Sequence, residues 1–163
     1  MRIGLTLSAV AAAALAGCVE QQAASYKTPS GRAEAFFAGT SPSTVSQRLV
    51  GLCADAGILV QRAESNQVVC GGEMQGGDAI LAQMAIGNAY STTPARFVQF
   101  MLFPYNGGTR VQTQQWVETQ MAFGQTNRVE LNSGAQFNEI MTALTKVGGR
   151  PFGAQVIQKS TDK

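Results

Sequence analysis

The stretch that decides the fold is ARFVQFMLFPYNGGTRVQTQQWVETQ, residues 95–120. Its first part, residues 95–103, is rich in Phe, Val, Met and Leu, which is typical of a central strand covered on both faces. The residues Tyr105-Asn106-Gly107-Gly108 then suit a tight turn. Residues 109–122 alternate between apolar and polar side chains, as a strand with two different faces does. This pattern predicts two long neighbouring strands joined by a turn.

The polar side of the second strand carries the candidate protein-binding residues. They recur at every second position and therefore share one face: Arg110, Gln112, Gln114, Trp116 and Glu118. An exposed Trp and Arg among uncharged polar groups suit a protein contact, because both residue types are enriched at interface hot spots. The alternative is that a helix or the C-terminal tail covers Trp116.

Two amphipathic helices are predicted on either side of this stretch. Ser41 is a suitable N-cap for the first helix, Pro42 suits its first position, and Gly57 can close it. Ser133 and Gln136 form a capping box for the last helix. Both helices carry apolar residues at helical spacing, and these are Val45, Leu49, Leu52, Cys53 and Ala56 in the first and Phe137, Ile140, Met141, Leu144 and Val147 in the last.

A hairpin and a short helix are predicted between these elements. Residues 58–62 and 67–70 read as two strands, followed by the glycine-rich break at 71–77 and a short helix starting at Asp78. The order is therefore helix, two strands, short helix, two strands, helix. It predicts an α+β domain with a four-stranded antiparallel sheet and two or three helices packed on one face.

The N-terminus indicates export. A basic start at Arg2 and an apolar run to Leu15 fit a secretory signal peptide, and the run is too short to span a membrane. The sequence LAGC at residues 15–18 resembles the lipobox of bacterial lipoproteins. This resemblance implies diacylglycerol on the Cys18 thiol, cleavage after Gly17 and acylation of the new amine. The alternative is a general secretory signal with an incidental cysteine.

The lipobox resemblance also implies a location and a division of the chain. Val19 stands where an aspartate is the usual inner-membrane retention signal, so the expected location is the outer membrane, facing the periplasm. We divide the chain into a signal peptide (1–17), a lipidated N-terminus and tether (18–40), the α+β domain (41–149) and a C-terminal tail (150–163). The layout of residues 41–148 is similar to the small α+β domains of envelope lipoproteins, including those of the outer-membrane barrel-assembly machinery, but it carries no functional residues across.

Two cysteines remain in the mature domain. Cys53 and Cys70 form an even pair in an exported chain, which favours a disulfide. Such a bond would contribute about 3 kcal/mol in the chain-entropy description. The alternative is two separate buried thiols.

Composition excludes several kinds of chemistry. Removal of residues 1–17 leaves 146 of the 163 residues, with 11 basic residues against 10 acidic ones, which gives no electrostatic signature for nucleic acid. The chain contains no histidine, so it offers neither Ser-His-Asp or Cys-His pairs nor imidazole metal ligands. We therefore expect no metal, no small-molecule cofactor and no nucleic-acid partner.

These observations predict a non-catalytic envelope lipoprotein that binds another protein or scaffolds an assembly. One alternative is a cell-wall glycan hydrolase that uses Glu73 and Asp78 as paired carboxylates. Another is an accessory lipoprotein of a conjugation or secretion apparatus.

Overall fold

A computed structural model describes residues 22–87, 91–153 and 155–156 of the chain. Cys18 and the signal peptide lie outside the described residues. The elements in chain order are β1 (Tyr26–Lys27), β2 (Glu34–Ala38), α1 (Pro42–Asp55), β3 (Val60–Ala63), β4 (Gln67–Glu73), α2 (Gly76–Ile86), β5 (Ala95–Tyr105), β6 (Gly108–Gln120), the 3-10 helix η1 (Ala122–Gly124), β7 (Thr126–Glu130), α3 (Gly134–Lys146), β8 (Arg150–Pro151) and β9 (Gln155–Val156).

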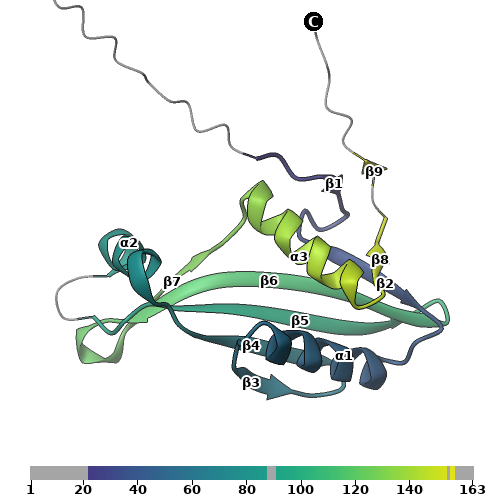
Figure 1. The fold of residues 1–163 in the computed structure, drawn as a ribbon, viewed down its shortest axis with the longest axis horizontal. Helices are drawn as coiled ribbons and strands as arrows, with labels where there is room; N and C mark the ends of the chain where they lie inside the picture. The colour runs from purple at the N-terminus through teal and green to yellow at the C-terminus, as the bar shows by residue number, and fades with distance from the viewer. Residues whose placement is uncertain (1–21, 88–90, 154, 157–163) are drawn as a thin grey trace, which may run out of the picture.

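The predicted hairpin of β5 and β6 is the centre of the fold. The two strands pair from Ala95↔Glu118 to Tyr105↔Gly108. Asn106 and Gly107 both have positive φ, which is the requirement of a two-residue type I′ turn that matches the twist of the flanking strands. Figure 1 shows the two strands running the length of the molecule.

The α+β class and the antiparallel sheet are confirmed, but the sheet in the described residues has seven strands rather than the predicted four. The strand order is β3-β4-β5-β6-β2-β8, and β7 also pairs with β6. The difference arises because β6 is 13 residues long and its outer edge holds two strands. β2 pairs along residues 108–112 of β6, whereas β7 pairs along residues 116–120.

Part of the sheet comes from segments that we assigned to the tether and the tail. β2 lies within residues 18–40, and β8, from the expected tail, pairs with it. A separate two-stranded ladder joins β1 to β9. The folded unit therefore extends on both sides of residues 41–149.

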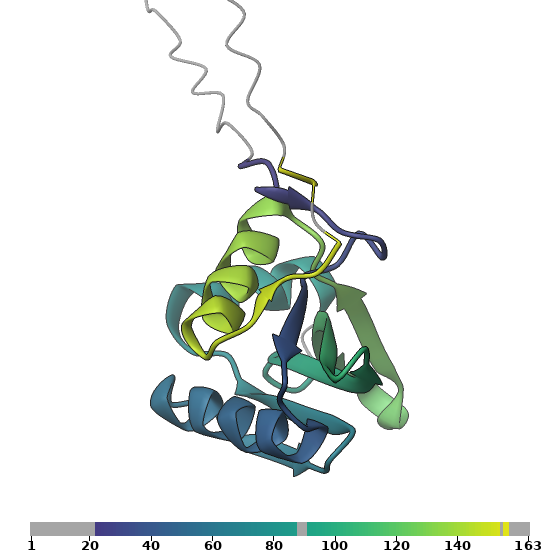
Figure 2. The ribbon, with the colours of Figure 1, turned by 90° about the vertical axis from the view of Figure 1, so that its right-hand side faces the viewer.

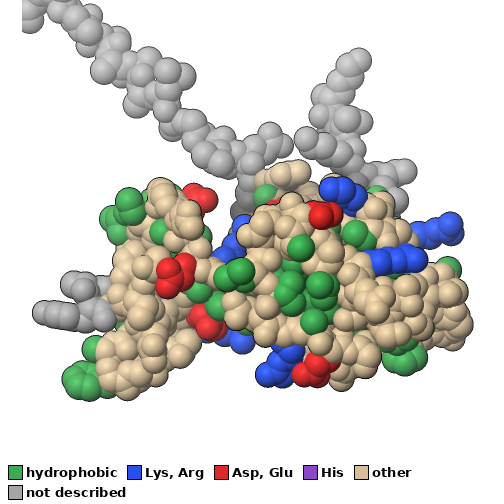
Figure 3. Space-filling model, turned by 60° about the horizontal axis from the view of Figure 1, so that its bottom comes forward, with side chains coloured by type: hydrophobic (Ala, Val, Ile, Leu, Met, Phe, Trp, Pro, Cys, Tyr) green, Lys and Arg blue, Asp and Glu red, His purple; other side chains and the backbone are tan. Residues whose placement is uncertain are grey.

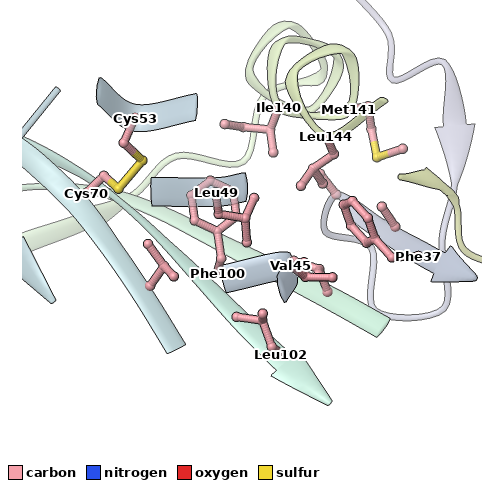
Figure 4. Close-up of a cluster of buried hydrophobic side chains, with 14 of the residues drawn as sticks. Phe37, Val45, Leu49, Cys53, Cys70, Phe100, Leu102, Ile140, Met141 and Leu144 are labelled. Atoms are coloured by element: carbon pink, nitrogen blue, oxygen red, sulfur yellow. A yellow bond between two sulfur atoms is a disulfide. The ribbon is translucent and has the colours of Figure 1, made fainter. Parts of the chain in front are cut away.

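Helices α1 and α3 pack on the same face of the sheet, α1 over β4 and β5 and α3 over β2 (Figure 2). The predicted caps at the start of both helices are confirmed. Ser41 accepts a hydrogen bond from the backbone N–H of Thr44, and Ser133 and Gln136 form the capping box. Figure 4 shows the buried side chains that these helices place against the sheet. They include Val45, Leu49 and Cys53 of α1, Ile140, Met141 and Leu144 of α3, and Phe37, Phe100 and Leu102 of the strands.

Helix α2 is predicted correctly as a helix, but it does not join α1 and α3 on the sheet. It lies at one end of the molecule, beside β6 and β7 (Figure 1), and none of its residues is buried. Within the described part of the chain, no helix combines the length and the apolar character needed to cross a membrane.

The cysteines of the domain form the predicted bond. Cys53 of α1 and Cys70 of β4 are joined by a disulfide, with their Cα atoms 6.3 Å apart. Both side chains are buried, and the bond fastens the helix layer to the sheet (Figure 4).

Candidate functional site

The five predicted binding residues of β6 share one face of the sheet, as their spacing predicts. We call this the helix-free face, because α1 and α3 cover the opposite one. Its members point away from the core residues Val111 and Thr113, which alternate with them along β6. The side chains on this face are, however, largely engaged with one another.

Arg110 is held in place by an ion pair. Its Nε donates a hydrogen bond to Oε2 of Glu34 at 2.8 Å, and the Glu34 side chain is 0% exposed. The other carboxylate oxygen of Glu34 accepts a hydrogen bond from the backbone N–H of Ser30 at 3.0 Å. The guanidinium also lies 4.5 Å from the ring centroid of Phe152. Arg110 therefore neutralises and covers a buried carboxylate, which is a structural role.

Trp116 is only 7% exposed, so the alternative in which it is covered is the one observed. Its ring contacts come from strands β5 and β7. The indole stacks on Phe97, with 5.4 Å between the ring centroids, and the guanidinium of Arg128 lies 3.9 Å from its centroid. Nε1 of Trp116 donates to Oε2 of Glu118 at 2.7 Å. An exposed tryptophan hot spot is therefore not present on this face.

Phe97 can lie flat beside Trp116 because its other cross-strand neighbour is Gly71. A Cβ atom at Gly71 would stand 2.3 Å from Cδ1 of Phe97. The glycine thus leaves room for the ring, and the row across the sheet becomes glycine, phenylalanine and tryptophan. The predicted glycine-rich break at 71–77 is therefore wrong for its first part, because β4 continues to Glu73.

Gln114 is also engaged. Its side-chain amide donates to Oε1 of Glu130, and Arg32 pairs with the other carboxylate oxygen at 3.3 Å. The hydrogen bond from Gln114, together with the positive charge of Arg32, lowers the pKa of the Glu130 carboxyl. Of the five predicted residues, Gln112 alone makes no side-chain contact of this kind with another described residue. It is the residue of the row that a partner could reach without breaking an internal bond.

A cleft on the opposite face is the better-formed site. It has a volume of about 790 Å³ and lies between the end of α1, the strands β3 to β5, the start of α2 and the side of α3. Figure 3 shows the molecule hollowed between the end that carries α2 and the main body, with acidic and basic side chains beside the hollow. The size and mixed lining are those of a typical ligand cleft.

The cleft has an apolar wall and a charged side. Ile58 and Leu59 form the wall, and Leu59 is 69% exposed. On the charged side Arg96 spans the gap between β5 and α3: its Nη2 contacts Oε2 of Glu139 at 3.0 Å and Oε1 of Gln115 at 3.1 Å. Ile58, Leu59 and Val60 are all exposed, and a contiguous exposed apolar patch of this kind marks a contact surface.

The two carboxylates proposed as the alternative glycan-hydrolysing pair both belong to the lining of this cleft. Glu73 at the end of β4 and Asp78 in the first turn of α2 both line it. Their sequence separation gave no indication that Arg96 and Glu139 would lie beside them. Only the apolar pair Ile58-Leu59 is a local signal for the cleft, and its pattern predicts the start of a hairpin strand. In the structure β3 begins at Val60, so this pair precedes the strand and stays exposed.

The described residues contain no group of three or more His, Cys, Asp or Glu side chains that could hold a metal ion. Comparisons of this chain with protein-family models, with curated proteins and with solved structures found no match.

Proposed function

We propose that this chain is an envelope lipoprotein, anchored through lipid on Cys18, that acts as a non-catalytic protein-binding module. The lipobox-like sequence LAGC after a signal-like segment supports the anchor and the expected outer-membrane location facing the periplasm. The observation that carries the binding role is the cleft, whose wall leaves Leu59 exposed beside the Arg96–Glu139 pair.

The chemistry of the cleft suits an extended segment of a partner protein. Ile58 and Leu59 would take apolar side chains of that segment, and burial of such a side chain is worth about 1.5–3 kcal/mol. Arg96 and Glu139 stand opposite, each with hydrogen-bonding capacity left for backbone groups of the segment. The alternative surface for binding the partner is the helix-free face, at Gln112.

An in-cell photocrosslink separates these two surfaces. A benzophenone amino acid is placed at Leu59 in one strain and at Gln112 in another, and conjugates are recovered with the lipidated protein. We expect one recurring protein conjugate from Leu59 and none from Gln112. A conjugate from Gln112 alone would move the site to the helix-free face, and no conjugate at either position would remove the binding role.

The hydrolase remains the second candidate because Glu73 and Asp78 line the same cleft. Purified protein is incubated with cell-wall glycan, and release of fragments is compared for the unmutated chain, Glu73→Gln and Asp78→Asn. On the binding proposal none of the three releases fragments. If the unmutated chain cleaves the glycan and both variants do not, the hydrolase replaces the binding proposal. A conjugate to a component of a conjugation or secretion apparatus would instead specify the third candidate.

A further inference from the structure

The chain joins the domain much closer to Cys18 than a tether over residues 18–40 implies. The backbone N–H of Ser25 donates to Oδ1 of Asn138 at 2.7 Å, and Nδ2 of Asn138 donates to the carbonyl of Ala23 at 2.9 Å. The carbonyl oxygen of Gln22 packs so closely on Gly134 that a Cβ atom added there would lie only 2.1 Å from it. Residues 22–25 are therefore packed on the first turns of α3.

This contact sets a limit on the distance between the anchor and the domain. Four residue steps separate Cys18 from Gln22, and an extended chain spans at most about 3.6 Å per residue, or roughly 14 Å in total. If Cys18 carries the lipid, as the proposed function holds, the start of α3 lies within about that distance of the lipid surface.

Helix α2 presents an apolar side that no other described element covers. Ile80, Leu81 and Met84 are 64%, 66% and 79% exposed, and positions i, i+1 and i+4 lie along one side of a helix. Asp78 is the only charged residue of the helix, and it lies in the first turn. A helix that is apolar all round is normally buried in protein or lipid.

The geometry places this helix and the anchored end at the two ends of β7. Nδ2 of Asn127, near the start of β7, donates to the carbonyl of Ile86 at 2.7 Å, which fixes the end of α2. Beyond Glu130 the chain leads directly to Ser133 and α3. Five strand residues rise roughly 16 Å. In Figure 1 both α2 and the first turns of α3 lie above the sheet.

We propose that α2 is a second membrane contact, which seats Ile80, Leu81 and Met84 in the lipid surface that holds Cys18. The short connection decides in favour of lipid over a partner protein, because it keeps this side of the domain next to the bilayer. An apolar helix side inserts at the boundary between headgroups and acyl chains. The lipid anchor then supplies proximity, and α2 fixes the orientation of the domain. Figure 3 shows hydrophobic side chains at the outer part of the end that carries α2.

Quenching by brominated lipid tests this contact. The acylated protein is purified from cells and reconstituted on vesicles of phosphatidylglycerol and phosphatidylcholine, with or without bromine on the phosphatidylcholine chains. Met84→Trp places a reporter on α2, and Gln47→Trp, at an exposed position of α1, is the matched control. Trp116 is the only native tryptophan and is common to both variants.

We expect brominated lipid to cause a loss of emission in Met84→Trp and no loss in Gln47→Trp beyond that of the unmutated protein. If brominated lipid quenches Met84→Trp no more than Gln47→Trp, on protein that floats with the vesicles, the contact of α2 is overturned and the anchor still stands. Protein that lacks acyl groups and does not float would refute the anchor and, with it, this inference. A benzophenone at Leu81 that yields a protein conjugate in cells would identify a partner protein in place of lipid.

Discussion

The guanidinium of Arg128 covers the indole of Trp116, with its central carbon 3.9 Å from the ring centroid. Arg128 belongs to β7, and Trp116 pairs with Glu130 of the same strand. The cation therefore shields the side of the ring that Phe97 leaves open. A residue type enriched at protein interfaces is here used to join two strands.

Arg128→Ala should lower the free energy of unfolding by about 1 kcal/mol, the scale of a cation–π contact near the surface. Emission of Trp116 should also shift to longer wavelength, because water would reach the indole. Denaturant unfolding followed by tryptophan fluorescence measures both effects. Arg62→Ala removes an exposed arginine of β3 and is the matched control. Equal losses from the two variants would show that Arg128 adds nothing through the ring.

Arg110→Met should destabilise the protein by about 3 kcal/mol, because it leaves the fully buried carboxylate of Glu34 without its cation. The double variant Glu34→Gln with Arg110→Met should recover most of that loss, since no buried charge remains. Thermal and denaturant unfolding of the two variants provide the comparison. A double variant as unstable as Arg110→Met would mean that shape, and not charge, matters at this position.

Cys53 and Cys70 should react with a thiol probe in the folded protein only after reduction. The bond closes a loop with a sequence separation of 17, so its loss should cost about 3 kcal/mol. The double variant Cys53→Ser with Cys70→Ser should match the reduced protein in denaturant unfolding. Labelling of both thiols in unreduced, folded protein would be incompatible with the disulfide.

Glu130 should contribute a pH-dependent part of the stability. Its pKa is lowered from the ordinary value of 4.5, first by the hydrogen bond from Gln114. A carboxyl with a lowered folded pKa stabilises the fold above its unfolded pKa, and this contribution disappears as the pH falls through the folded pKa.

Gln114→Ala should therefore raise the pKa of Glu130 toward 4.5 and weaken that acid dependence. Carboxyl titration followed by NMR measures the shift directly. Gln112→Ala alters the neighbouring position of the same face, which has no contact with Glu130, and should leave the titration unchanged. An unchanged pKa in Gln114→Ala would assign the lowering to Arg32 and Asn132 instead.

The β5–β6 hairpin and the two packed helices could be predicted from sequence because their signals are local. Alternation along residues 109–120, the turn at Asn106-Gly107 and the caps Ser41 and Ser133 each act over a few neighbouring residues. β7 could not be predicted in this way, because Thr126–Glu130 has a single large apolar residue, Val129. Its place in the sheet depends on the free second half of the edge of β6.

Of the candidate site on β6, likewise, only the part that depends on local alternation could be predicted. Alternation placed Arg110 and Trp116 on one face, but their partners Glu34 and Arg128 stand on strands that the pattern did not reveal. Glu34 in particular looked like part of a polar tether, since a charge at that position gives no sign of an arginine 76 residues later. Contacts between distant segments, including Arg96 with Glu139, form only when the sheet is assembled.

The anchor at Cys18 is the claim on which both the proposed location and the membrane contact of α2 depend. Mass spectrometry of the intact mature protein and of its N-terminal peptide tests it most directly. We expect a chain that begins at Cys18 and carries the added mass of diacylglycerol and an amide-linked acyl chain, with Cys18→Ser left uncut and unmodified. A mature chain that begins elsewhere, or an unmodified Cys18, would contradict the account.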